Sequence, residues 1–128
     1  MTEARAKVLL VEDDADLADM YRLRLEIARI QVTIARDGDG ALEAAASLAP
    51  DLVLLDLNLP RRNGLDVIRL LREDPATRHV PLVVLSADSD PDTVAEAEGL
   101  GVLAYVMKSS TSPAMLVALV REWLSSRT

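Results

Sequence analysis

Five short runs of apolar residues, rich in Val, Leu and Ile, are spaced along the chain. Within each run the apolar residues are nearly continuous and do not alternate with polar ones. Such runs are typical of strands that helices cover on both faces, because neither side of the strand then meets water. The predicted strands are residues 8–11, 32–35, 52–55, 80–85 and 102–106.

Segments of helical character follow these runs. The first has Asp14 as its N-cap and apolar residues at intervals of three and four. The last two open with a capping residue followed by proline, at Asp90-Pro91 and Ser112-Pro113. The predicted helices begin after Asp14, span residues 40–48 and 65–72, and begin at Pro91 and Pro113.

The alternation of strand and helix predicts the fold class. Five strand-then-helix units favour a parallel sheet with right-handed crossovers, which is an open, doubly wound α/β domain. A length of 128 residues is close to the commonest size of one domain, so we expect a single domain over residues 1–128.

Composition narrows the classes of function. The formal net charge of −7 argues against direct binding to nucleic acid or to anionic membranes, whose phosphates attract basic surfaces. No apolar run approaches the ~20 residues of a membrane-spanning helix, so a cytoplasmic protein without a membrane partner is expected. The chain has no cysteine, which excludes disulfides, thiolate metal sites and a cysteine nucleophile.

Candidate chemistry lies at the carboxyl ends of the predicted strands, where open α/β sheets bind their ligands. Glu12 and Asp13 follow the first strand, Asp56 the third, Ser86 the fourth and Lys108 the fifth. Oxygen ligands beside one cation suit a hard divalent metal and a phosphoryl group.

Most of these residues also have an ordinary structural explanation. Asp14 is most simply a helix N-cap, and Glu12 and Asp13 are acids that the helix dipole favours in a first turn. Asp56 is harder to explain, because aspartate directly after a buried strand is unfavourable there.

Ser86 fits a turn, and Lys108 fits a solvated surface position. The chain has 14 basic residues, of which only Lys7 and Lys108 are lysine, so a lysine at a strand exit is unusual for this composition. A compact ammonium suits contact with one phosphoryl oxygen, whereas the planar guanidinium group needs a fork-shaped partner.

Taken together, these residues resemble the receiver domain of bacterial two-component response regulators, the CheY-like superfamily. The resemblance covers essentially the whole chain and is carried by VLLVEDD at 8–14, VLLDLNLPRRNG at 53–64, VVLSA at 83–87 and AYVMK at 104–108. It implies a flavodoxin-like parallel sheet of order 2-1-3-4-5 with helices on both faces, and a receiver with no output domain in this chain.

The resemblance also implies a metal site and a phosphoacceptor. Asp56 would accept the phosphoryl group, and the metal ligands would be Glu12, Asp13, Asp56 and the backbone carbonyl of Asn58. Oxygen ligands of this kind suit Mg²⁺, or Mn²⁺ in its place.

Two further roles follow from the resemblance. Lys108 and Ser86 would contact the phosphoryl oxygens, and Ser86 with Tyr105 would form a switch pair. The chain would then be a signalling domain rather than an enzyme, limited to its own phosphorylation and dephosphorylation.

Partners are implied as well. The phosphoryl donor would be a histidine kinase or a histidine phosphotransfer protein, docked at the apolar stripe of Met20, Leu23 and Ile27 in the first helix. A homodimer through the fourth helix, fifth strand and fifth helix is a further expectation, because the fifth helix is apolar almost all round.

The chain departs from the family pattern after Lys108, where Ser109 replaces the usual proline. A cis bond there would cost about 2.5–4 kcal/mol, so a trans loop and a different approach of Lys108 remain open. Arg61 and Arg62 add cations near the pocket, either to steer an acidic donor or as part of a solvated loop.

Two other classes of function remain open. A receiver-like binding module could signal without phosphorylation, which the missing proline keeps in view. An aspartyl-nucleophile phosphatase is the other class, but it needs a second aspartate two residues on as general acid, and the amide of Asn58 cannot supply a proton as an acid does.

Overall fold

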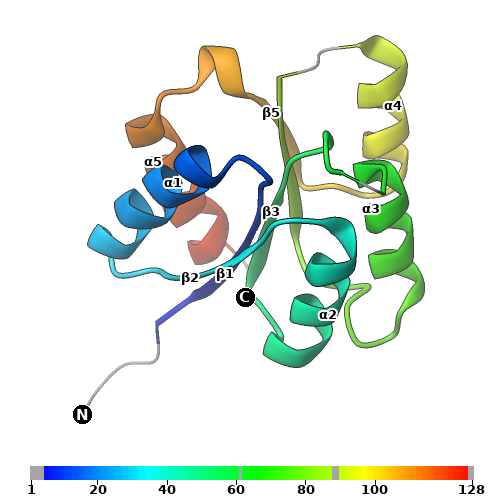
Figure 1. Cartoon of the computed structure of the whole chain (residues 1–128), viewed down its shortest axis with the longest axis horizontal. Coiled ribbons are helices and arrows are strands. Elements are labelled where there is room, and N and C mark those ends of the chain that lie inside the picture. Colours follow the sequence, from blue (N-terminus) through cyan, green and yellow to red (C-terminus); the bar gives the residue numbers. More distant parts are fainter. Residues whose placement is uncertain (1–4, 61, 88–89, 127–128) are drawn as a thin grey trace.

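The computed structural model describes residues 5–60, 62–87 and 90–126. Its centre is a parallel sheet of five strands in the order β2-β1-β3-β4-β5, with helices on both faces (Figure 1). The predicted fold class and strand order are therefore confirmed. The strands are β1 Lys7–Val11, β2 Gln31–Ala35, β3 Leu52–Leu55, β4 Leu82–Ser86 and β5 Ala104–Met107.

Helices α1 and α5 cover one face of the sheet, and α2, α3 and α4 cover the other (Figure 1). The helices are α1 Ala15–Ile27, α2 Gly38–Leu48, α3 Gly64–Glu73, α4 Pro91–Gly99 and α5 Pro113–Ser125, with a short 3-10 helix, η1, at Lys108–Ser110. None of the helices in the described part of the chain has the length and apolar character needed to cross a membrane.

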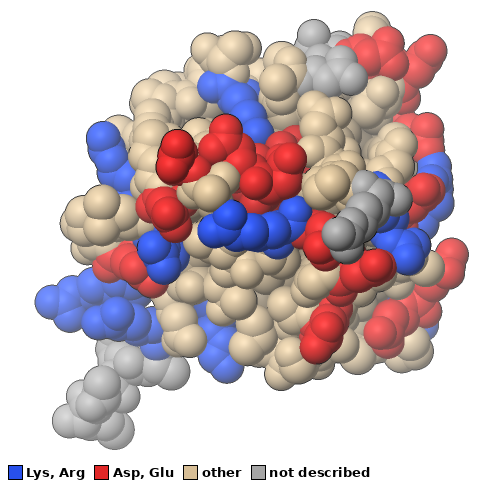
Figure 2. Space-filling model, in the orientation of Figure 1, with Lys and Arg blue, Asp and Glu red and all other residues tan. Residues whose placement is uncertain are grey.

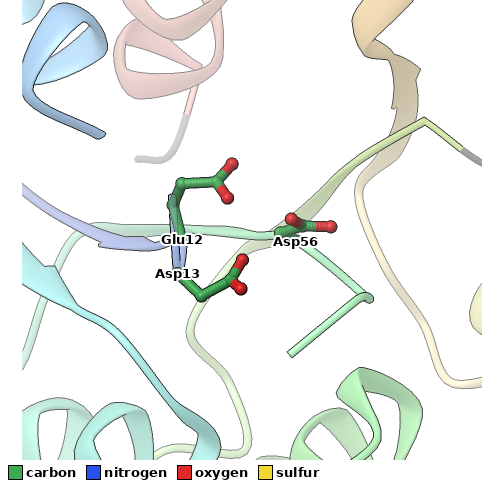
Figure 3. A group of neighbouring side chains, drawn as sticks. All are labelled: Glu12, Asp13 and Asp56. Carbon is green, nitrogen blue, oxygen red and sulfur yellow. The ribbon is translucent and has the colours of Figure 1, made fainter. Parts of the chain in front are cut away.

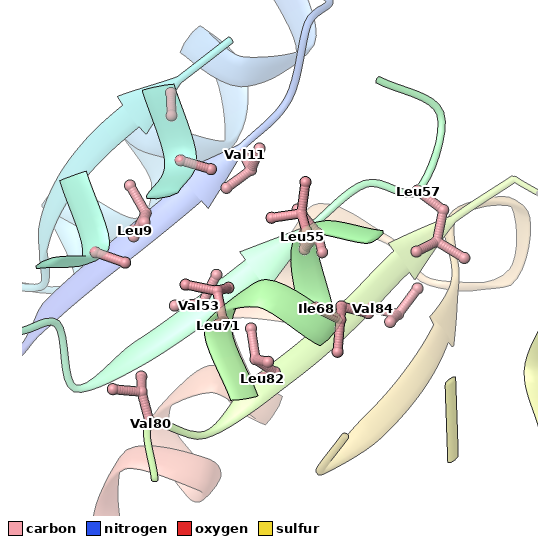
Figure 4. Packing of buried hydrophobic residues seen from close by; sticks show 14 of the residues in the cluster. Leu9, Val11, Val53, Leu55, Leu57, Ile68, Leu71, Val80, Leu82 and Val84 are labelled. Carbon is pink, nitrogen blue, oxygen red and sulfur yellow. The ribbon is translucent and has the colours of Figure 1, made fainter. Parts of the chain in front are cut away.

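Successive residues of each strand enter opposite cores, because side chains alternate across a sheet. In β1, Leu9 and Val11 pack with α2 and α3, whereas Val8 and Leu10 pack with α1 and α5. Figure 4 shows the first of these cores, in which leucine and valine side chains from several strands meet α3. Burial on both faces explains why the strands read as continuous apolar runs.

Side-chain caps set where the helices begin. Asp14 Oδ1 accepts a hydrogen bond from the backbone of Leu17 at 3.1 Å, which confirms the predicted N-cap of α1. Asp37 caps α2 through the backbone of Gly40 at 2.7 Å. Because Asp37 is the cap, α2 begins at Gly38 rather than at the predicted residue 40.

Two strands begin later than predicted. Residues 80 and 81 are not part of β4, because the backbone N–H of Val80 bonds to Thr77 at 3.1 Å in a turn. The carbonyl of Val80 instead accepts from the guanidinium of Arg72 at 2.8 Å. Similarly, β5 begins at Ala104 and not at residue 102.

Candidate functional site

The carboxyl ends of β1 and β3 bring two buried acids together. Val11 is the register partner of Leu55, and the backbone N–H of Asp56 donates to the carbonyl of Val11 at 3.0 Å. Glu12 and Asp56 therefore leave neighbouring strands at the same level. The two residues are only 2% and 5% exposed, respectively, which is rare for carboxylates without a counter-charge.

Lys108 supplies that counter-charge from the end of β5. Its Nζ lies 2.6 Å from Oε1 of Glu12 and 3.0 Å from Oδ2 of Asp56. One ammonium thus bridges two buried carboxylates. Such a bridge offsets part of the cost of removing three charged groups from water.

The electrostatics of this group follow from burial and pairing. Burial raises the pKa of Glu12, and the charge of Asp56 raises it further, against the lowering effect of Lys108. For Lys108, burial lowers the pKa, but the hydrogen bonds and charges of Glu12 and Asp56 outweigh it and the net pKa is raised. The lysine is therefore held in its charged form.

Three carboxylates converge at this edge of the sheet. Glu12, Asp13 and Asp56 each offer an oxygen, and these atoms all lie within 4.8 Å of one another (Figure 3). Asp13 is exposed, so the group is open to solvent on one side. Asn58 lies beside it, since its backbone N–H donates to Oδ1 of Asp56 at 3.0 Å.

The loop after Lys108 is compatible with this contact. The Lys108–Ser109 peptide is trans, and Lys108–Ser110 form the 3-10 helix η1. Lys108 therefore reaches both carboxylates without the proline that is usual in the family.

Ser86 and Tyr105 lie on the face of the sheet that α2, α3 and α4 cover. Val84 pairs in register with Tyr105, and Ser86 is the last residue of β4, two positions further along. Ser86 is fully buried, and Tyr105 is half-buried against the core of α2, α3 and α4. The structure thus places both predicted switch residues on one side, and their switching role stays a prediction.

The two arginines predicted near the pocket have different outcomes. Arg61 lies outside the described residues. Arg62 is paired with Asp39 at the start of α2, at 3.0 Å, so this cation is already bound within the protein.

On α1, the apolar stripe is open to solvent, with Leu23 61% and Ile27 72% exposed.

Sequence reasoning missed two basic residues. Arg72 in α3 donates to four backbone carbonyls, those of Arg78, Val80, Leu100 and Gly101. Arg36 follows β2 directly and so stands at the same sheet edge as the acidic group. Arg36 could have been found from the sequence, because it directly follows the second apolar run.

A doubly wound sheet of order 2-1-3-4-5, with acids and a lysine at its carboxyl edge, defines the class of CheY-like domains. A CheY-like receiver domain protein from Methanospirillum hungatei has the same fold, with a TM-score of 0.90 over 97% of each chain and 21% identity. The model of the response regulator receiver domain family matches residues 8–121. The chain belongs to the response regulator receiver domain family.

More specific relatives share larger fractions of the sequence. The DNA-binding response regulator MtrA of Mycobacterium tuberculosis is 43% identical over 121 residues, which are 94% of this chain and 51% of MtrA. The chain thus spans about half the length of that relative. The phosphorylated cyanobacterial phytochrome response regulator RcpA is 30% identical, with a TM-score of 0.82 over 98% of this chain and 97% of RcpA.

The likeness to MtrA corrects one expectation. The absence of a nucleic-acid partner was predicted from the net charge of −7, but MtrA is a DNA-binding protein. The aligned segment is only about half of MtrA, and its charge therefore does not decide what a whole response regulator binds. The prediction of no nucleic-acid partner was wrong for this reason.

Proposed function

We propose that this domain takes up a phosphoryl group on Asp56 and thereby switches a response regulator between two states. The observation that carries the proposal is the buried Asp56 carboxylate, which lies in the acidic group and 3.0 Å from the Lys108 ammonium. The family membership supports it, and so does the likeness to RcpA, whose structure was solved in a phosphorylated form.

The residues at the sheet edge fit a magnesium ion. Mg²⁺ prefers hard oxygen ligands, and Glu12, Asp13 and Asp56 offer three carboxylates within 4.8 Å. Asp13 and Asp56 would hold the ion with the Asn58 carbonyl, and Glu12 would act mainly through a bound water. When bound, Mg²⁺, or Mn²⁺ in its place, offsets the repulsion between a carboxylate nucleophile and phosphoryl oxygens.

The transfer step uses residues of this chain. A carboxylate oxygen of Asp56 attacks phosphorus and forms an acyl phosphate, while the bond from phosphorus to the donor breaks and the donor leaves with that electron pair. The donor is a phosphohistidine of a kinase or phosphotransfer protein, or a small acyl phosphate. Lys108 and Ser86 stabilise the charge on the phosphoryl oxygens.

Signal output requires a second state of the protein. Ser86 moves toward the phosphoryl group, and Tyr105 on the same face of the sheet follows, so the surface around β5 changes. By likeness to MtrA, the regulated protein is a response regulator that acts on DNA.

Intact mass spectrometry after incubation with acetyl phosphate or phosphoramidate and Mg²⁺ tests the proposal. We expect one added phosphoryl group on the wild type, none on Asp56→Asn, and one on the control Asp16→Asn, an exposed acid in the first turn of α1. No adduct on the wild type would favour a binding module that signals without phosphorylation. Steady release of phosphate from added phosphomonoesters would favour a phosphatase.

A further inference from the structure

Arg36 lies next to the acidic group of Glu12, Asp13 and Asp56, at the carboxyl edge of the sheet. The backbone N–H of Glu12 donates to the carbonyl of Ala35 at 3.0 Å, which places Arg36 beside Glu12. Val32 and Ile34 pack against the core of α1 and α5, and Arg36 follows them in the two-residue alternation. Arg36 therefore lies on the same sheet face as Glu12, one strand beyond it.

Unlike Lys108 and Arg62, the other basic residues described around the pocket, Arg36 has no carboxylate partner among the described residues. Lys108 is bound to Glu12 and Asp56, and Arg62 is bound to Asp39. Arg36 is exposed, and its side chain forms no ion pair or hydrogen bond with the residues that the structure describes. Figure 2 shows basic side chains next to a patch of acidic side chains on this face of the molecule.

The carboxylates of the site repel an anionic phosphodonor, and a basic side chain at the rim offsets this repulsion. A phosphodonor is an anion, and it must approach three carboxylates on a protein of net charge −7. A cation at the rim raises the local concentration of an anionic reactant. Arginine suits this role, because its planar fork binds phosphoryl oxygens in pairs and stays charged at every working pH.

We infer that Arg36 is a specificity-determining residue that draws the phosphoryl group of an anionic donor, such as a small acyl phosphate, to Asp56. This inference rests on the proposed function. Arg36 acts on the encounter between donor and site, and Lys108 acts on the transfer itself.

A cation at this place has opposite effects on the two ligands of the site. Arg36 attracts an anionic donor and repels Mg²⁺, so its removal weakens apparent donor binding and strengthens Mg²⁺ binding. A variant that merely loosened the pocket would weaken both. The direction of the two changes therefore separates an electrostatic role from a structural one.

Chain variants at the two ends of β2 provide the test. Arg36→Gln removes the cation at the site, Arg36→Glu reverses it and Arg36→Lys keeps it. Arg29→Gln is the matched control, because Arg29 is also exposed and adjoins β2 at its opposite end. The readouts are the rate of phosphorylation against acetyl phosphate concentration at saturating Mg²⁺, and the Mg²⁺ dissociation constant in the absence of donor.

At low ionic strength we expect Arg36→Gln to raise the half-saturating donor concentration about threefold, with the maximal rate unchanged, and Arg36→Glu about tenfold. The Mg²⁺ dissociation constant should fall in both variants, and the differences should shrink with added salt. Arg29→Gln should stay near the wild type, and Arg36→Lys should lie between the wild type and Arg36→Gln, because it keeps the charge but lacks the planar fork.

Three results would overturn the inference. They are an unchanged donor dependence in Arg36→Glu, weaker Mg²⁺ binding together with weaker donor binding, and an equal effect of Arg29→Gln, which would show that only net charge matters. A wild type that reacts normally while Arg36→Glu matches it leaves the proposed function intact. A wild type that takes up no phosphoryl group overturns both.

Discussion

The Nζ of Lys108 lies 2.6 Å from Oε1 of Glu12, although the two residues are 96 positions apart in the chain. The same ammonium lies 3.0 Å from Oδ2 of Asp56, so one positive charge is shared between two buried carboxylates that are far apart in the sequence. A bound Mg²⁺ would take over part of this neutralisation. Lys108 and the metal therefore compete for the same charges, and two measurements follow from that competition.

Replacing Lys108 should destabilise the metal-free domain and strengthen its binding of Mg²⁺. Lys108→Met leaves Glu12 and Asp56 buried without a counter-charge, which should lower the free energy of unfolding by about 1–3 kcal/mol. Urea denaturation without metal measures the loss, and Mg²⁺ titration measures the gain in affinity. Lys7→Met is the control, since Lys7 is exposed and is the other lysine of the chain. An equal loss in both variants would contradict a specific role of Lys108.

We expect the Arg72 side chain to contribute strongly to the free energy of unfolding. Its guanidinium joins the segment before β4 to the turn between α4 and β5 through four carbonyls at 2.8–3.2 Å. Arg72→Ala leaves those carbonyls without their donor and should cost about 2–3 kcal/mol of unfolding free energy. Arg69→Ala, which breaks exposed pairs with Asp66 and Glu96, should cost about 0–1 kcal/mol.

Denaturant midpoints of the two variants, measured side by side, decide this prediction. A loss for Arg69→Ala as large as that for Arg72→Ala would show that the bonds to the carbonyls add nothing beyond ordinary surface pairing. Arg72→Lys should recover only part of the stability, because one ammonium cannot reach two separate segments.

The fold and part of the site could be predicted because their signals are local. Apolar runs and capping residues are set by neighbours in the sequence, and the ends of parallel strands meet at one edge whatever their separation. Asp56 was identifiable because an acid after a buried strand is costly. The site residues could thus be placed together before any distance was known.

Other features could not be predicted, for two physical reasons. The partners of Arg72 are backbone carbonyls, which every residue carries, so no residue type marks them. The start of β4 was placed too early because Val80 looks like a strand residue, yet its N–H is used in a turn. The error about nucleic acid has a different origin, since the charge of this chain does not decide what a relative of about twice its length binds.

Tyr21 should make stability sensitive to alkaline pH. Burial raises its pKa above the ordinary value of 10.0, so the unfolded chain ionises first as the pH rises. Its contribution is constant below pH 10.0 and is lost as the pH climbs toward the raised value. Between about pH 9 and pH 11, Tyr21→Phe should therefore lose less unfolding free energy than the wild type.

Urea denaturation at several pH values, with tyrosinate absorbance as a second probe, measures the effect of Tyr21. Tyr105→Phe serves as the companion variant, because Tyr105 is half-buried in the other core. Identical pH profiles for the wild type and Tyr21→Phe would contradict the prediction.

Gly64 and Gly99 should respond oppositely to the same substitution. A Cβ at Gly64 would lie 2.5 Å from the Cα and 2.9 Å from the carbonyl oxygen of Leu57, whereas nothing lies within 4 Å at Gly99. Gly64→Ala must displace backbone and should cost about 1–3 kcal/mol. Gly99→Ala fills open space at the end of α4 and should stabilise by up to about 0.5–1 kcal/mol.

The displaced backbone at Gly64 also bears on the site. Leu57 directly follows Asp56, and its carbonyl accepts the N–H of Gly64 at 3.1 Å. Gly64→Ala should therefore slow phosphoryl uptake by Asp56 even where the domain is fully folded, and Gly99→Ala should not. Phosphorylation rates measured well below each variant's unfolding midpoint separate this effect from stability. A normal rate in a folded Gly64→Ala variant would mean that the loop absorbs the displacement without moving Asp56.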